Sequence, residues 1–291
     1  MNIALTGSSG LIGSHLLKDF LNHGHEVLCI SSSKSSHEDN IFLYEEPQLK
    51  MINFKADFFI HLASINSNLS NSDISLEIEL LNKVLNCMEY LECKNIIFFS
   101  TIKVYGENSF NSYFMNVDEN FPKNPECSYG QAKKHCEKTL ISKAKEKNFN
   151  YLILRLPPVL INHPKSNVGK LFQIVEKGLP ILSFRIGDTN QRSFLSYDLL
   201  LHVMNEILND GVISSSNILN ISDTQPISTN NLLRNFGESI HKKPRIIYLP
   251  QFLFKAMMKL NRLQFILCRL FGNFHASNTR LKETYKIPKH F

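Results

Sequence analysis

The chain has 291 residues, of which 43% are hydrophobic and 20% are charged, and its formal net charge at pH 7 is +6. This composition is typical of a globular protein and excludes a disordered chain. The modest positive charge lacks the concentrated basic face of a nucleic-acid binder, so no nucleic-acid partner is expected.

The six cysteines are scattered and form no C-x-x-C pair, which is typical of free thiols in a reducing cytosol. Met1 leads directly into an apolar stretch without a basic segment, so we predict no signal peptide and a cytoplasmic protein. The most membrane-like stretch, residues 249–272, is interrupted by four lysines and arginines, so we predict no membrane span. The eleven histidines form no metal-binding pattern, so no metal is expected.

The first half of the chain alternates apolar strand-like segments with segments of helical periodicity. Strands are expected at residues 3–5, 25–30, 57–63, 95–101 and 151–156, and helices from residue 11 and at 74–91 and 128–145. Such alternation predicts an α/β fold with a Rossmann-type doubly wound parallel sheet.

The second half is richer in proline and turn signals. We therefore predict two domains. Residues 1–160 form a dinucleotide-binding domain, and residues 161–291 form mainly a smaller C-terminal substrate-binding lobe, interleaved with the last core elements.

Three glycines, Gly7, Gly10 and Gly13, span the junction of the first strand and the first helix. In a strand–turn–helix setting, such glycines permit a tight turn, a close backbone approach to a pyrophosphate and close helix–strand packing. The pyrophosphate then lies on the exposed amides of the helix N-terminus. The turn therefore predicts dinucleotide binding.

The end of the second strand indicates which dinucleotide is bound. An NAD site usually places an acidic residue there, but this chain has Ser31, Ser32, Ser33 and Lys34. The hydroxyls and the ammonium group suit a 2′-phosphate, so NADP is favoured and NAD remains possible.

Tyr129 and Lys133 lie four residues apart in "SYGQAK", so both side chains share one face of a helix. A phenol with a pKa near ~10 becomes a useful acid or base at neutral pH when an ammonium group stabilises the phenolate. The fourth strand ends in Ser100-Thr101, where a hydroxyl can bond a reacting carbonyl.

With these motifs the chain resembles extended short-chain dehydrogenases/reductases of the nucleotide-sugar epimerase/dehydratase family. The matching motifs are "TGSSGLIG", "HLAS", "STIKVYG" and Y-x-x-x-K. Several later segments, including "EKGLPIL" and "NQRSFLSYDLL", resemble 4-ketoreductases of the UDP-N-acetylquinovosamine type. Pro158 stands where many epimerases have a substrate-binding asparagine, which favours the reductase branch.

The resemblance implies NAD(P)H-dependent reduction of a 4-keto nucleotide-diphosphate sugar in bacterial surface-polysaccharide synthesis. Tyr129 donates the proton, Thr101 polarises the carbonyl, and Lys133 holds the cofactor ribose and tunes Tyr129. The alternative is an NAD-dependent nucleotide-sugar 4-epimerase with the same three residues. A non-catalytic NADP-sensing protein is the remaining alternative, and the complete catalytic set argues against it.

The resemblance also implies the binding residues and the assembly. The expected cofactor-binding residues are Gly7, Ser9, Gly10, Leu11, Ile12, Gly13, Ser31, Ser32, Lys34, Leu62, Ala63, Tyr129 and Lys133. Ser64, Asn167 and Arg192 are expected to bind the substrate. Related enzymes form homodimers through two helices of each subunit, here about 74–91 and 128–145. On the first of these, Leu81, Leu85 and Met88 form one apolar stripe, which faces either the partner subunit or the chain's own sheet.

Overall fold

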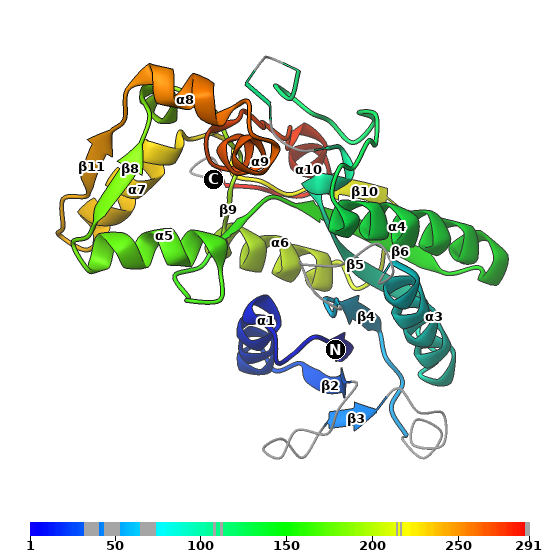
Figure 1. The fold of residues 1–291 in the computed structure, drawn as a ribbon. Coiled ribbons are helices and arrows are strands. Elements are labelled where there is room, and N and C mark those ends of the chain that lie inside the picture. The colour runs from blue at the N-terminus through cyan, green and yellow to red at the C-terminus, as the bar shows by residue number, and fades with distance from the viewer. Residues whose placement is uncertain are drawn as a thin grey trace.

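A parallel sheet of seven strands organises the described chain (Figure 1). The computed structural model describes residues 1–31, 41–43 (backbone only), 53–64, 74–106, 109–110, 113–213, 215 and 217–288. The strands are β1 (Asn2–Thr6), β2 (Glu26–Ser31), β3 (Ile41–Leu43), β4 (Phe58–His61), β5 (Asn95–Thr101), β6 (Asn150–Leu156) and β10 (Asn217–Asn220). Their order across the sheet is β10-β6-β5-β4-β1-β2-β3, and every neighbouring pair is parallel. The predicted α/β fold with a Rossmann-type doubly wound sheet is confirmed.

The strand order reverses between β1 and β4, so the chain winds outward from the middle of the sheet in both directions. Thr6 at the end of β1 pairs with Ile30 of β2 and with His61 of β4. In open sheets of this kind, ligands bind beyond the carboxyl ends of the strands at the reversal point. The predicted glycine turn follows β1 at this point.

Helices cover both faces of the sheet, because residues along each buried strand point alternately to the two sides. Ile3 and Leu5 pack in a cluster with α1 (Leu11–Asn22) and α6 (Tyr197–Asn209). Ala4 packs on the other face with α3 (Ile74–Tyr90) and α4 (Ser128–Lys147). Figure 1 shows α3 and α4 side by side on that face.

The apolar stripe of α3 packs on the sheet. Leu81, Leu85 and Met88 are each at most 4% exposed within the single chain, in the same cluster as the strands. Of the two positions expected for this stripe, contact with the sheet is therefore the one observed, because its side chains are buried by the subunit's own core. Dimerisation itself stays a prediction.

The remaining elements form a smaller lobe, which lies on the opposite side of the molecule from α3 and α4 in Figure 1. Its elements are α5 (Asn167–Glu176), β8 (Pro180–Ser183), η3 (Arg185–Asp188), α7 (Thr229–Ser239), β11 (Arg245–Tyr248), α8 (Gln251–Met257) and α9 (Asn261–Phe271). Short strands β7 (Val159–Leu160) and β9 (Leu195–Ser196) pair with each other, and α10 (Thr279–Thr284) lies beside β10. The division of the chain at residue 160 into a cofactor domain and a substrate domain stays a prediction.

The membrane-like stretch, residues 249–272, forms the amphipathic helices α8 and α9. No helix within the described residues is long and apolar enough to cross a membrane. All six cysteines are free thiols, as expected.

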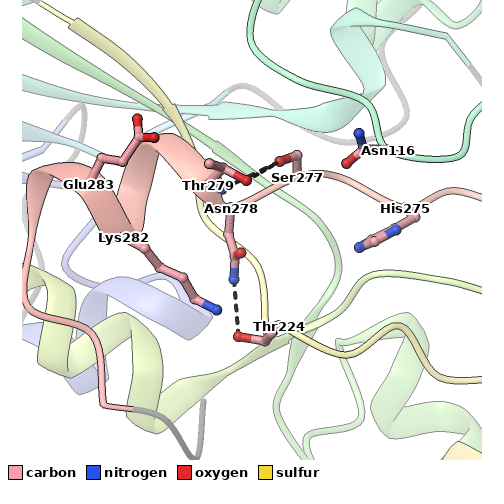
Figure 2. A pocket seen from close by; sticks show the side chains of 8 residues that line it. All are labelled: Asn116, Thr224, His275, Ser277, Asn278, Thr279, Lys282 and Glu283. Carbon is pink, nitrogen blue, oxygen red and sulfur yellow. Dashed lines mark hydrogen bonds between the residues drawn. The ribbon is translucent and has the colours of Figure 1, made fainter.

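An open pocket lies beside α10 (Figure 2). Its lining residues are Asn116, Thr224, His275, Ser277, Asn278, Thr279, Lys282 and Glu283. Asn278 Nδ2 donates to Thr224 Oγ1 at 3.3 Å, so part of this lining is bonded within the fold. Of the predicted site residues that the structure describes, none lines this pocket.

Candidate active site

The glycine turn after β1 is too tight for side chains. Gly7 has a φ of +76°, and a Cβ placed there would lie 2.8 Å from the backbone nitrogen of Ala63. A Cβ at Gly13 would lie 2.0 Å from the carbonyl oxygen of Gly7, and one at Gly10 would lie 3.0 Å from that oxygen. The turn is closed by a hydrogen bond from Gly10 N to Gly7 O at 2.9 Å. The glycines therefore fold the chain back on itself and bring bare backbone to the end of the sheet.

Helix α1 begins directly after Gly10. No side chain of the described residues caps its N-terminus, and its first turn has no acidic residue. Ser9 and Gly10 are exposed, and Leu11 and Ile12 are half-buried. Amides at an uncapped helix N-terminus attract anions through their N–H groups and the helix dipole. The turn and the helix together fit the diphosphate of a dinucleotide.

The end of β4 lies against this turn. Thr6 Oγ1 bonds His61 Nδ1 at 2.7 Å, and the backbone nitrogen of Ala63 donates to the same hydroxyl at 3.3 Å. Burial lowers the pKa of His61 to about 3, with a further contribution from Lys133, so this imidazole is neutral at physiological pH. Leu62 and Ala63 therefore follow a rigid strand end and are half-buried beside Gly7.

The end of β2 bears on the choice between NAD and NADP. Ser31 is the last residue of the strand and is half-buried. Ser32 and Lys34 lie outside the described residues. The preference for NADP stays a prediction.

Tyr129 and Lys133 lie one turn apart near the start of α4. Lys133 Nζ is 5.9 Å from the ring centroid of Tyr129 and 4.8 Å from that of Phe98 on β5. A second ammonium group, that of Lys103 in η2 (Ile102–Val104), lies 6.0 Å from the Tyr129 ring centroid. The sequence interpretation missed Lys103, which no spacing rule links to Tyr129.

Gly130 lets α4 approach η2 closely. A Cβ at this position would lie 2.6 Å from the carbonyl oxygen of Lys103, so only glycine fits. Since η2 directly follows Thr101, this contact brings the start of α4 to the end of β5. Tyr129 therefore belongs to the part of α4 that packs where β5 ends and η2 begins.

Of the two hydroxyls at the end of β5, Thr101 is the candidate for a substrate contact. Ser100 Oγ donates to Glu137 Oε1 at 2.7 Å in a buried network, so its proton is already used. Thr101 Oγ1 accepts from Lys103 N at 3.3 Å, which orients the oxygen and leaves its proton for a donor role.

A carboxylate that the sequence interpretation did not single out lies beside Lys133. Glu77 Oε1 of α3 is 2.9 Å from Lys133 Nζ, and the two side chains are 2% and 1% exposed. Ser64 Oγ donates to the same Glu77 oxygen at 2.8 Å. The sequence pattern that could have predicted this role is the position of Glu77 on the same helical stripe as Leu81, Val84 and Met88. A charge on such a buried stripe needs a partner.

The ion pair affects the acid–base properties of Tyr129. Burial raises the pKa of Tyr129, Lys133 lowers it, and Glu77 raises it again, so the pKa lies above its ordinary value. Burial by itself would lower the pKa of Lys133, but Tyr129 and Glu77 raise it above its usual range. Tyr129 is therefore a protonated phenol at neutral pH in this arrangement.

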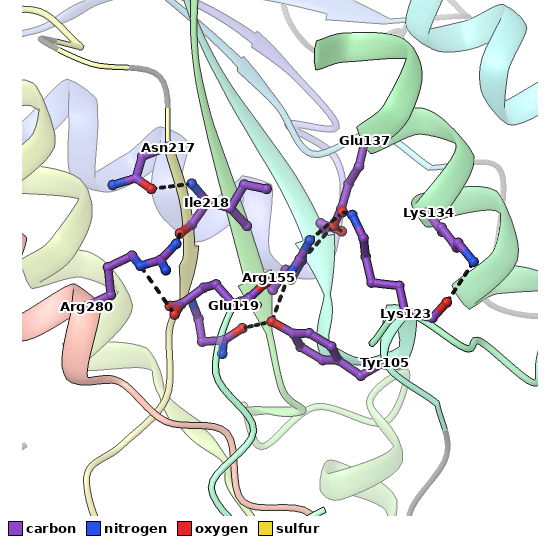
Figure 3. Close-up of polar contacts among 11 residues, drawn as sticks. Tyr105, Glu119, Lys123, Lys134, Glu137, Arg155, Asn217, Ile218 and Arg280 are labelled. Carbon is purple, nitrogen blue, oxygen red and sulfur yellow. Dashed lines mark hydrogen bonds and ion pairs between the residues drawn. The ribbon is translucent and has the colours of Figure 1, made fainter. Parts of the chain in front are cut away.

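A buried polar network behind the site holds α4 against the sheet (Figure 3). Arg155 of β6 donates to both carboxylate oxygens of Glu137, from Nε at 2.9 Å and from Nη2 at 2.7 Å. Arg155 Nη1 donates to Tyr105 Oη at 2.7 Å, which in turn donates to Asn220 Oδ1 at 2.7 Å. The network links β6, α4 and β10, so it positions the helix that carries Tyr129 and Lys133.

Two of the predicted substrate-binding residues, Asn167 and Arg192, lie in the second half of the chain. Asn167 is the first residue of α5 and is exposed. Arg192 is buried, and its Nη1 donates to the carbonyl oxygen of Gly272 after α9 at 3.0 Å. Its guanidinium therefore has at least one structural partner. Substrate binding by Ser64, Asn167 and Arg192 stays a prediction.

Comparison with known proteins places these features in a family. A protein of Vibrio cholerae named UDP-glucose 4-epimerase is 26% identical over 308 residues, covering 99% of this chain and 91% of its own length. A protein of Aggregatibacter actinomycetemcomitans named dTDP-6-deoxy-L-talose 4-dehydrogenase (NAD(+)) is 30% identical over 145 residues, covering 46% of this chain and 52% of its own. The crystal structure of UDP-N-acetylglucosamine 4-epimerase from Bacillus cereus superposes with a TM-score of 0.78 at 15% identity, covering 100% of this chain and 95% of that one. The profile of the NAD dependent epimerase/dehydratase family matches residues 3–218, and the chain belongs to this family.

Proposed function

We propose that this protein is a nucleotide-sugar 4-epimerase that uses NAD. The observation that carries the proposal is the packing of α4, which begins with the segment of Tyr129 and Lys133, against η2 and β5, which ends at Thr101. The same carboxyl edge of the sheet holds the glycine turn that fits a dinucleotide diphosphate. The relative named UDP-glucose 4-epimerase, which matches 99% of the chain, supports it over the reductase branch that the sequence motifs favoured.

Each residue of the set has a defined task in this reaction. The phenolic oxygen of Tyr129 takes the proton from the hydroxyl on carbon 4 and later returns it. NAD, held by the turn around Gly7 and Gly10, would supply the hydride acceptor and donor for that carbon. Thr101 donates a hydrogen bond to the reacting oxygen, and Lys133 stabilises the phenolate.

A second candidate is reduction of a 4-keto nucleotide sugar with NADPH. The buried Lys133–Glu77 pair favours it, because Tyr129 kept as a phenol is ready to donate a proton but not to accept one. The absence of a carboxylate at Ile30 and Ser31 favours NADP, and Pro158 follows β6 where many epimerases have asparagine. A relative that matches 46% of the chain is named a 4-dehydrogenase, which supports redox chemistry at carbon 4 of a nucleotide sugar, although its name specifies NAD.

The proposal also covers the substrate-binding residues, the location of the protein and its assembly. We infer that Asn167 and Arg192 face the substrate diphosphate, since arginine forms paired hydrogen bonds to phosphate oxygens. A cytoplasmic location, a homodimer and a place in surface-polysaccharide synthesis follow from the family resemblance alone.

One experiment separates the two candidates. The purified protein is incubated with UDP-glucose or UDP-N-acetylglucosamine and NAD, and separately with a 4-keto sugar nucleotide and NADPH. An epimerase interconverts the 4-hydroxy sugars with no net change in cofactor absorbance, whereas a reductase consumes one NADPH for each ketone. Tyr129→Phe serves as the control in both assays. A wild-type protein without either activity, when it binds both ligands, would contradict the proposal.

A further inference from the structure

Glu77 is a buried acid within the catalytic arrangement that the reaction itself does not use. Its carboxylate contacts Lys133 Nζ at 2.9 Å and the hydroxyl of Ser64 at 2.8 Å, both through Oε1. Glu77 and Lys133 are almost completely removed from solvent, so their charges are not screened by water. Whatever charge Glu77 carries therefore acts strongly on the neighbours of Lys133.

The groups that face Tyr129 come from several elements, and only some of them are charged near neutral pH. Lys133 and Lys103 contribute positive charge and Glu77 negative charge. The buried thiol of Cys136 has a pKa raised to about 12, and His61 has a pKa lowered to about 3, so neither is ionised there. Cys127, at the start of α4, acts on Tyr129 in the same direction as Cys136. Glu137, beside Cys136, is paired with Arg155.

We propose that Glu77 is a positioning residue: it fixes the ammonium group of Lys133 and offsets part of its positive charge, so that Tyr129 keeps its proton to higher pH. The proposal rests on the proposed function only in taking Tyr129 as the acid–base group. In this proposal Glu77 of α3 acts together with Lys133 and Tyr129 of α4.

The sign of the effect follows from the charges. With Glu77 present, Lys133 is shared between a carboxylate and the phenol. When the carboxylate is neutralised, the phenolate becomes the remaining anionic partner of Lys133, so Tyr129 ionises at lower pH. An opposite charge within ~4–6 Å lowers such a pKa by about 1–3 units, and we expect the lower end because Glu77 acts through Lys133.

The test is the pH dependence of turnover in Glu77→Gln, which keeps the shape of the side chain and removes its charge. The pH-profile limb that belongs to Tyr129 should move to lower pH by about one unit. Glu79→Gln is the matched control, since Glu79 lies on the same helix but is exposed and paired with Lys83. Its profile should coincide with that of the wild type. A Glu77→Gln enzyme that is slower at every pH with an unmoved limb would assign Glu77 a purely structural role and overturn the proposal.

A direct titration keeps the test independent of activity. Ionisation of Tyr129 is followed by the ultraviolet absorbance of tyrosinate, as the difference between each variant and the same variant carrying Tyr129→Phe. The midpoint should fall in Glu77→Gln and fall less in Glu77→Asp, which also serves if the glutamine variant does not fold. If the limb of the pH profile moves but the midpoint of tyrosinate absorbance does not, the titrating proton belongs to Lys133, and the proposal is refuted. A tyrosinate midpoint that does not move in Glu77→Gln contradicts this inference alone. A midpoint that moves, in a protein that shows neither proposed activity, supports this inference and contradicts the proposed function.

Discussion

Glu137→Gln removes one charge of the buried ion pair that holds α4 to β6. Both Glu137 and Arg155 are 0% exposed, and two hydrogen bonds of 2.7 and 2.9 Å join them. Breaking such a pair by neutralising one partner costs about 3–5 kcal/mol, because the other charge stays buried without compensation. With roughly 2 °C lost for each kcal/mol in a chain of this size, Tm should fall by at least ~6 °C.

The same pair predicts how this loss depends on pH. Burial alone would raise the pKa of Glu137, but the hydrogen bonds and charge of Arg155 lower it below its ordinary value. A carboxyl with a lowered pKa in the folded state contributes stability above its unfolded pKa, near ~4.3, and loses it as pH falls through the folded value. The Tm difference between wild type and Glu137→Gln should therefore be full at pH 7 and shrink in acid.

Thermal unfolding followed by circular dichroism at several pH values measures both effects. Glu146→Gln is the matched control, because Glu146 lies on the same helix and forms an exposed pair with Lys143. The double variant Glu137→Gln/Arg155→Met should lose less than the sum of the two single variants, since it leaves no buried charge without a partner. A Tm for Glu137→Gln that equals the control's would refute the reasoning.

Four further predictions concern catalysis, the cofactor and assembly. Tyr129→Phe should lower turnover at least ~10²-fold with nearly unchanged cofactor affinity, measured by steady-state kinetics and cofactor titration; full activity would remove Tyr129 from the mechanism. Gly13→Ala should abolish cofactor binding in fluorescence titration, because its Cβ would lie 2.0 Å from Gly7 O, and unchanged affinity would contradict the assigned turn. Ser31→Asp should raise the preference for NADH over NADPH by ~10-fold or more, and Lys34→Ala should weaken NADPH binding alone; an unchanged preference would contradict a role of this strand end in cofactor choice, and a wild type that prefers NADPH would favour the reductase candidate over the NAD-dependent epimerase. Sedimentation at micromolar concentration should give a dimer, and a monomer would exclude it.

The sheet and the spacing of Tyr129 and Lys133 on one helix could be predicted from the sequence because both depend on local periodicity. Strand β5 covers Asn95–Thr101 as predicted, and α3 ends within one residue of the expected position. Such segments bury a continuous or periodic apolar surface, which the order of residues records directly. Strand β4 ends at His61, two residues earlier than expected. After the strand, the backbone N–H of Ala63 donates to Thr6 Oγ1 and leaves the ladder, and the same backbone lies against Gly7.

The second half of the chain was harder to interpret because its elements are short and pair over long distances. Strand β8 pairs with β11, and β10 returns to the edge of the main sheet beside β6. Short strands carry little periodicity, so which of them joins which sheet depends on contacts between residues far apart in the chain.

The alternation of apolar segments was sufficient to predict the fold, and the spacing of Gly7, Gly10 and Gly13 and the Y-x-x-x-K motif led to the proposals of a cofactor turn and an acid–base pair. Each of these requires only neighbours within a few residues. The partners of that pair were decided by tertiary structure alone. Glu77 reaches Lys133 because α3 and α4 pack side by side on one face of the sheet, and Glu137 reaches Arg155 because α4 lies over β6. A charge buried by such packing must find its counterpart across the fold, and no spacing within one helix records where that counterpart lies.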